Sequence, residues 1–200
     1  MMVSDGLMRF DDRIGEYLPA FRMADPVANA EVTLRDGLSH RSGIGRGELI
    51  WLGAGIPRDE VLRRTRFLQP ESPFRSRYSY QNILYLAVGV ATARAAGTTW
   101  EELVVQRIFE PLGMRASLAK ATGTAHPNVA HPHGSARDSV FLKPLLSAEN
   151  IAPAGSILSS ARDMAQWVRF QLGDGEFEGR RLVDAAAFRE THSPQILMPL

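Results

Sequence analysis

Apolar residues recur at three- and four-residue spacings in several stretches of the chain, and this spacing predicts helices. The longest such stretch begins near Asn82, carries Ile83, Leu86 and Val90, and is closed by Gly97. It predicts an apolar helix of roughly 14 residues, about 21 Å long. The loop before it, residues 70–75, contains two prolines, which resist any regular element.

Other helices are predicted by their start signals. A Ser or Thr followed three residues later by an acid is the pattern of a capping box or N-cap. The pairs are Thr33 with Asp36, Thr99 with Glu102, and Ser160 with Asp163. The last of these helices carries Met164, Trp167, Val168 and Leu172 on one side. Two further helices are expected over residues 57–68 and 185–190.

Strands are almost missing from the pattern. The chain shows no sustained period-two alternation and no Asn-Gly or Asp-Gly turn between β-branched runs. Residues 121–150 are rich in Gly, Pro, His and Ser and are expected to form a long irregular loop. The sequence therefore predicts helices joined by ordered loops.

Composition narrows the class of protein. The 200 residues are enough for one large domain or one and a half small ones, and a hydrophobic fraction of 44% is typical of a globular protein. Because 23 Lys and Arg nearly balance 22 Asp and Glu, no bulk field favours nucleic acid or an anionic membrane. The absence of cysteine excludes disulfides, thiolate nucleophiles and Cys-ligated zinc. No apolar run reaches the roughly 18 residues of a membrane span, and no signal peptide is visible at the start.

Two local clusters have an ordinary interpretation. The arginines between Arg58 and Arg77 are interrupted by acids, and a solvated helix face is expected rather than a nucleic-acid site. His126, His131 and His133 lie close together, but prolines interrupt any helix that would fix them as ligands. We therefore expect no metal and no cofactor.

The stretch Arg77 to Asn82 is the main candidate for a functional site. It is polar, contains two tyrosines, and stands at the start of the apolar helix. A rigid scaffold would present side chains to a cleft at such a position.

Four motifs in a fixed order carry a resemblance to a known family. They are Leu38-Ser39-His40-Arg41-Ser42-Gly43-Ile44, Tyr80-Gln81-Asn82, Ile108-Phe109-Glu110-Pro111-Leu112-Gly113-Met114, and Pro153-Ala154-Gly155-Ser156 with Ser160-Ala161-Arg162-Asp163-Met164-Ala165. Together they resemble the superfamily of serine β-lactamases, penicillin-binding proteins and esterases, on its class C β-lactamase-like branch. The resemblance covers nearly the whole chain.

The resemblance implies three site elements: a Ser-x-x-Lys nucleophile, a Tyr-x-Asn element and a Lys-Thr-Gly-like strand. Tyr80 matches the second element as the catalytic tyrosine, and Asn82 matches it as the substrate-binding amide. A phenol is a weak base at neutral pH unless nearby cations stabilise its phenolate, and the family's lysine would supply that charge. Tyr78 has a tyrosine rather than an asparagine two residues on, so it is assigned to packing.

The other two elements are not in their expected places. The Ser-x-x-Lys pattern occurs only at Ser117 to Lys120, after the Tyr-x-Asn element rather than before it, and is interpreted as chance. The expected fold is therefore α+β and β-lactamase/transpeptidase-like, with residues 1–200 forming a single partial domain. This domain would be mostly the helical lobe, lacking most of the antiparallel sheet. Apolar faces should then be exposed on Trp167, Val168 and the Ile83 helix.

The implied function is that of a serine hydrolase. Such enzymes form and hydrolyse an acyl-serine intermediate on β-lactam, ester or D-amino-acid peptide substrates. The expected partner is a small-molecule or peptidoglycan-like substrate, and the chain alone is expected to be inactive because its nucleophile must come from outside residues 1–200. The alternative is a non-catalytic helical binding module derived from the same family.

Overall fold

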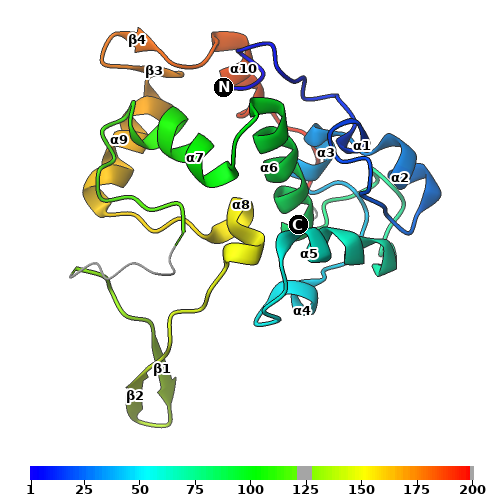
Figure 1. Ribbon diagram of the computed structural model, residues 1–200, viewed down its shortest axis with the longest axis horizontal. Coiled ribbons are helices and arrows are strands. Elements are labelled where there is room, and N and C mark those ends of the chain that lie inside the picture. The colour runs from blue at the N-terminus through cyan, green and yellow to red at the C-terminus, as the bar shows by residue number, and fades with distance from the viewer. Residues whose placement is uncertain (121–127, 199–200) are drawn as a thin grey trace.

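The computed structural model describes residues 1–120 and 128–198, and most of their regular structure is helical (Figure 1). The α-helices are α1 (Ile14–Tyr17), α2 (Pro26–Glu31), α3 (Leu34–Leu38), α4 (Glu48–Trp51), α5 (Arg58–Arg64), α6 (Asn82–Ala96), α7 (Trp100–Val104), α8 (Ala152–Gly155), α9 (Ala161–Leu172) and α10 (Ala185–Glu190). The 3-10 turn η1 (Thr65–Phe67) extends α5, and the 3-10 turn η3 (Glu149–Ile151) precedes α8. The π-helical turn η2 (Val105–Phe109) continues α7.

Strands are short and antiparallel, as the resemblance implies. Strands β1 (His133–Ala136) and β2 (Ser139–Leu142) form a hairpin, and β3 (Glu176–Phe177) pairs with β4 (Arg180–Arg181). The β1–β2 hairpin projects from the body of the molecule (Figure 1). The expectation of an irregular loop is therefore wrong over residues 133–142. The hairpin turn places Arg137 in the left-handed region. The sequence did not predict this turn because the position has no Gly or Asn, the residues that usually adopt this conformation in hairpin turns.

The predicted helix starts are confirmed by their capping geometry. The Thr33 and Thr99 side chains each accept a hydrogen bond from the third helical N–H, and both capping boxes are complete. Ser160 caps α9 through the Asp163 N–H. Gly97 ends α6 in the left-handed conformation, which glycine adopts without steric cost. Because these caps involve residues within one helical turn, they can be predicted from the sequence.

Helix α6 is the centre of the first hydrophobic cluster. It contacts α1, α3, α5, α7 and α8, and Ile83, Leu84 and Leu86 have no exposed surface. Burying each of these side chains contributes roughly 2 kcal/mol relative to exposure. The expectation of an exposed apolar face is therefore wrong at Ile83, because the surrounding helices cover this position.

A second hydrophobic cluster joins α7, α9 and α10. Phe170 packs against Trp167 and edge-on against Phe188, with centroid separations of 5.4 and 5.6 Å. On the outer side of α9, however, Val168 is 48% exposed and Leu172 is 81% exposed. Here the expected apolar face is present at Val168, whereas Trp167 is only partly exposed because it packs against the second cluster.

Candidate active site

The segment before α6 is extended and alternates between buried and outward-facing residues. Ser79 and Gln81 are buried, whereas Tyr80 is 40% exposed and Tyr78 and Asn82 are partly exposed. Successive side chains of an extended backbone point to opposite faces. The structure therefore presents Tyr80 and Asn82 outward at the N-terminal end of α6, with Gln81 turned inward between them.

Buried polar groups hold this segment against the loop after α3. The Gln81 Nε2 donates to the Gly45 carbonyl at 2.6 Å, and its Oε1 accepts from the Ile83 N–H at 2.9 Å. The Ser79 hydroxyl donates to the Ile44 carbonyl at 3.2 Å. Gln81 thus caps α6 while joining it to the loop, so the Tyr80 backbone has little freedom.

An aromatic cluster surrounds His40, which lies in the same loop. Its ring centroid is 4.5 Å from that of Tyr80 and 5.0 Å from that of Tyr85, with which it stacks at 26°. Tyr78 meets the same ring edge-on at 5.6 Å. Burial lowers the pKa of His40 below its ordinary value, which favours a neutral imidazole. The packing expected for Tyr78 is consistent with this contact.

The polar atoms of the two predicted site residues are available to a ligand. Among residues 1–120 and 128–198, neither the Tyr80 hydroxyl nor the Asn82 carboxamide has a hydrogen-bond partner. The Arg46 guanidinium lies 5.5 Å from the Tyr80 ring centroid and forms an ion pair with Glu48 at 2.8 Å. Arg46 therefore places positive charge beside the phenol, a feature that the sequence alone did not indicate.

The hydroxyl of Ser117, in the only Ser-x-x-Lys match of the sequence, is engaged in hydrogen bonds. It donates to Asp163 Oδ2 at 2.7 Å and contacts the Ser159 hydroxyl at 2.8 Å. The same carboxylate oxygen accepts the Ala116 N–H, whereas Lys120 is exposed. A hydroxyl bonded to a buried carboxylate, without its lysine, supports the interpretation of this Ser-x-x-Lys match as chance.

Most of the arginines between Arg58 and Arg77 form ion pairs, either within α5 or with an acid on another helix. Such pairing leaves little uncompensated charge along this face, which fits the interpretation as a solvated surface. The pairs are Arg63 and Arg64 with Glu60, Arg58 with Glu101, and Arg75 with Asp36.

The described histidines do not gather with other potential metal ligands. No group of three or more potential ligands gathers within residues 1–120 and 128–198. His131 and His133 are exposed, and His126 lies outside the described residues. In the described part of the chain, no helix is long and apolar enough to span a membrane.

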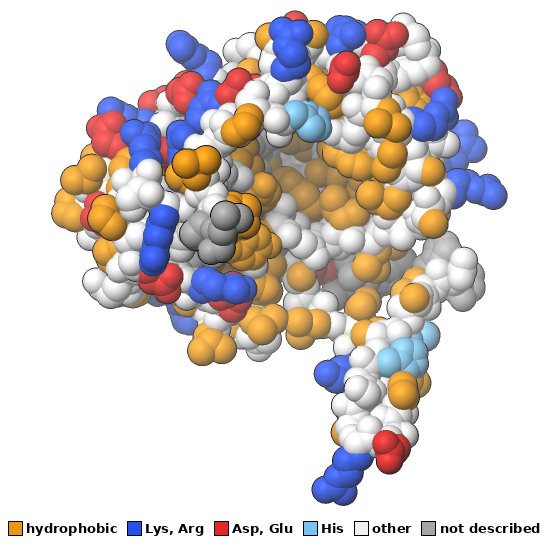
Figure 2. Space-filling view, turned by 180° about the vertical axis from the view of Figure 1, so that it is seen from behind, with side chains coloured by type: hydrophobic (Ala, Val, Ile, Leu, Met, Phe, Trp, Pro, Cys, Tyr) orange, Lys and Arg blue, Asp and Glu red, His pale blue; other side chains and the backbone are white. Residues whose placement is uncertain are grey.

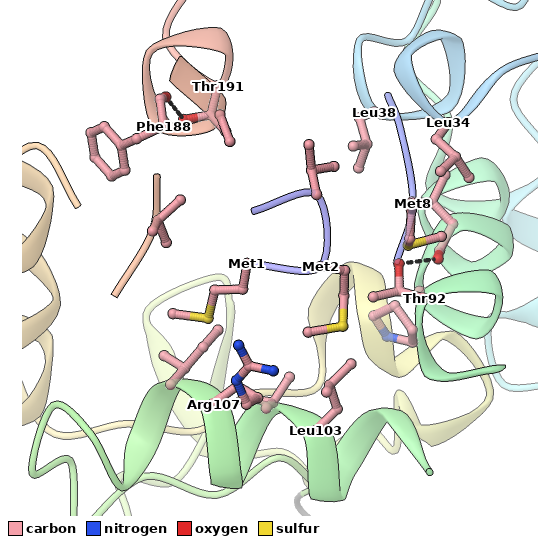
Figure 3. A pocket seen from close by; sticks show the side chains of 18 of the residues that line it. Met1, Met2, Met8, Leu34, Leu38, Thr92, Leu103, Arg107, Phe188 and Thr191 are labelled. Atoms are coloured by element: carbon pink, nitrogen blue, oxygen red, sulfur yellow. Dashed lines mark hydrogen bonds between the residues drawn. The ribbon is translucent and has the colours of Figure 1, made fainter. Parts of the chain in front are cut away.

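A large apolar cavity lies between the two hydrophobic clusters (Figure 3). Its volume is about 570 Å³, and helices α3, α6, α7, α9 and α10 contribute to its walls. The N-terminal methionines Met1, Met2 and Met8 point into it (Figure 3). A hollow lined by hydrophobic side chains is visible on the face seen in Figure 2. Tyr85 lines the cavity and stacks on His40, so the cavity adjoins the Tyr80 cluster.

The structure is thus a helical layer in which a Tyr-x-Asn element faces outward at the start of the central helix α6. The family described as Beta-lactamase matches residues 1–196, which is nearly the whole chain. The chain belongs to this family.

Relatives of known sequence are considerably longer. "Penicillin-binding protein 4" of Amycolatopsis lactamdurans is 28% identical over 195 residues, covering 93% of this chain and 50% of that protein. "Gigasin-6" of Magallana gigas is 28% identical over 148 residues, covering 70% of this chain and 48% of its own length. The chain thus spans about half the length of these relatives.

Solved structures confirm the fold. A D-stereospecific amidohydrolase from Streptomyces sp. superposes with a TM-score of 0.80 at 22% identity, covering 98% of this chain and 61% of that one. The octameric penicillin-binding protein homologue from Pyrococcus abyssi gives 0.81 at 20% identity, with coverages of 96% and 44%. The chain therefore has part of a β-lactamase/transpeptidase-like fold, mostly helical with short antiparallel strands.

Proposed function

We propose that residues 1–200 form a single partial domain that supplies Tyr80 and Asn82 to the site of an acyl-serine hydrolase. The observation that carries this proposal is the pair itself. Tyr80 and Asn82 are presented outward at the start of α6, and their polar atoms have no partner within the described residues. Membership of the Beta-lactamase family supports a serine hydrolase as the whole protein.

In the proposed reaction Tyr80, as its phenolate, receives the proton of the serine hydroxyl. The serine oxygen then bonds to the substrate carbonyl carbon, and the departing amine or alcohol takes up the proton. Water hydrolyses the acyl-serine ester and restores the enzyme. Asn82 has both a donor and an acceptor, which suits it to holding a substrate amide beside the serine.

The nucleophile is proposed to come from a segment outside residues 1–200. The apolar cavity supports this part of the proposal, because a large hollow lined by hydrophobic side chains is a surface that a further segment of chain can cover. Its connection to Tyr80 through Tyr85 and His40 would bring a segment that fills it close to the phenol.

The substrate class is an activated or amide-linked acyl group. Relatives and neighbours bear the names penicillin-binding protein, D-stereospecific amidohydrolase and D-amino acid amidase. We therefore propose β-lactams, esters or D-amino-acid peptides and amides as substrates for the whole protein.

A chimera tests the proposal. Residues 1–200 are joined to the portions of the Amycolatopsis penicillin-binding protein 4 that they do not cover, and labelling by a fluorescent penicillin and turnover of a nitrophenyl ester are measured. We expect labelling in the chimera and none in residues 1–200 alone. Tyr80→Phe should reduce acylation by about a hundredfold or more, whereas Tyr78→Phe, the matched control, should retain most of it.

The results also separate the two candidate functions. A folded chimera that binds penicillin reversibly without acylation would favour the binding module. Acylation that persists in Tyr80→Phe would remove this residue from the proposed role. Stoichiometric labelling of residues 1–200 alone would point back to Ser117.

A further inference from the structure

His40 makes main-chain contacts on both sides of Tyr80. Its carbonyl oxygen accepts a hydrogen bond from the Ser79 N–H at 2.7 Å, and its ring Nδ1 accepts one from the Gln81 N–H at 3.1 Å. The residue before Tyr80 and the residue after it are thus bonded to the same histidine. No other residue in the described part of the chain bonds to both of these N–H groups.

The backbone of His40 is adapted to these two contacts. Its φ is positive, in the left-handed region that is uncommon for residues other than glycine. Such a conformation costs free energy and persists only where surrounding contacts determine it. At His40 those contacts are directed at the Tyr80 segment.

The ring adds a third contact, to the tyrosine itself. Its centroid lies 4.5 Å from the Tyr80 centroid, and it stacks on Tyr85 at 5.0 Å. The position of Tyr80 is therefore set both by the backbone hydrogen bonds of its two neighbours and by the contact of its ring with His40.

We propose that His40 is a positioning residue for Tyr80, and that it acts as the neutral tautomer with the proton on Nε2. The proposal rests on the function proposed above, since it concerns how the site tyrosine is held. Nδ1 must be unprotonated because it accepts the Gln81 N–H.

Protonation of the ring would break this arrangement. A proton on Nδ1 would face the Gln81 N–H, and two donors cannot form a hydrogen bond. The other groups around the ring are the phenols of Tyr78, Tyr80 and Tyr85, and the Arg46 guanidinium lies 5.5 Å from the Tyr80 ring centroid. In the described residues no carboxylate forms an ion pair with His40 that would stabilise its cation. The contact therefore exists only above the pKa of His40.

Two substitutions separate the acceptor from the backbone conformation. In His40→Asn the side-chain oxygen is bonded to Cγ, as Nδ1 is in histidine, and asparagine tolerates the left-handed region. His40→Gly also tolerates that region but has no acceptor. Both variants lose the ring, so their difference reports the hydrogen bond to Gln81. His133→Asn, on the exposed hairpin, is a control for the loss of a histidine.

The first test uses NMR on ¹⁵N-labelled residues 1–200. The Gln81 amide signal should titrate with the same midpoint as the His40 ring, below the ordinary value of 6.5. This titration should be present in His133→Asn and absent in His40→Asn. If the chemical shift of the Gln81 amide does not change as His40 ionises, or changes with a different midpoint, the proposal is overturned.

The second test uses the chimera described above. We expect His40→Gly to acylate about tenfold more slowly than the natural chain, with an unchanged KM, and His40→Asn to recover most of the lost rate. His40→Asn should also lack the decline in rate at acid pH that follows His40 protonation. Equal rates in His40→Gly and the natural chain would contradict the positioning role. If the chimera does not acylate at all, the proposed function fails, and the NMR titration still decides whether His40 holds the Tyr80 segment.

Discussion

Gln81 and Gly45 are joined by a buried hydrogen bond of 2.6 Å from the Gln81 Nε2 to the Gly45 carbonyl oxygen. Gln81 is 1% exposed, and the other end of its carboxamide caps α6 at Ile83. This side chain therefore fixes the start of α6 and the loop carrying His40 and Arg46 in one position.

Replacing Gln81 with alanine should destabilise the chain considerably. Gln81→Ala leaves the Gly45 carbonyl and the Ile83 N–H without partners in a buried place, at a cost of about 2–3 kcal/mol in the free energy of unfolding. Urea denaturation measures the loss. Gln106→Ala is the control because Gln106 is exposed, and surface substitutions of this kind change stability by only a few tenths of a kcal/mol. Equal effects of the two substitutions would contradict the bridging role.

Gly43 is predicted to be intolerant of any side chain. Its φ is 80°, and a Cβ would lie 2.5 Å from the Ser72 carbonyl oxygen. Gly43→Ala should cost more than about 2 kcal/mol, because left-handed strain and a backbone clash combine. Gly6→Ala is the matched control, since Gly6 has a φ of 73° but nothing near its Cβ. It should cost only about 1 kcal/mol in the same denaturation experiment.

Asp36 is predicted to make stability depend on acid pH. Burial opposes its ionisation, but hydrogen bonds from Arg75, Thr33 and Arg41 outweigh burial and hold the pKa of Asp36 below its ordinary value of 3.8. A lowered folded-state pKa stabilises the fold fully above the unfolded value, and this contribution is lost as pH falls through the folded-state pKa. The natural chain should therefore lose stability on acidification below about pH 4.

The Asp36→Asn variant isolates this contribution. At pH 7 two arginines lose a buried partner, so the variant should be less stable by about 3 kcal/mol. The difference from the natural chain should shrink as pH falls through the window just described. Asp138→Asn, on the exposed hairpin, should behave like the natural chain throughout. A difference that stays constant from neutral to strongly acid pH would exclude the assigned role of Asp36.

Ser117 is predicted to matter for stability and not for acylation. Ser117→Ala removes one hydrogen bond to Asp163, and this should lower the free energy of unfolding by about 1 kcal/mol. A chimera that carries Ser117→Ala should be labelled by penicillin at the same rate as the unsubstituted chimera. Loss of labelling together with retained stability would reverse this assignment and make Ser117 the nucleophile.

The sequence by itself determined the local features of the fold. Capping residues such as Thr33 and Thr99, and the glycine at position 97, act within one helical turn, so their positions in the chain suffice to place helix ends. The order of short motifs also sufficed for the family, which the match over residues 1–196 establishes. Tyr80 and Asn82 were predicted from that same order.

Only the tertiary structure decided how distant segments meet. The contacts of His40 with Gln81 and of Ser117 with Asp163 join residues far apart in the chain, and neither follows from periodicity or capping. Likewise, the cover over Ile83 and the exposure of Val168 depend on which helices pack on each face. Local patterns specify elements, whereas burial and long-range hydrogen bonds depend on their assembly. That is why Tyr80 could be proposed as the site tyrosine from the sequence, whereas the contacts of His40 with the Tyr80 segment emerged only from the folded chain.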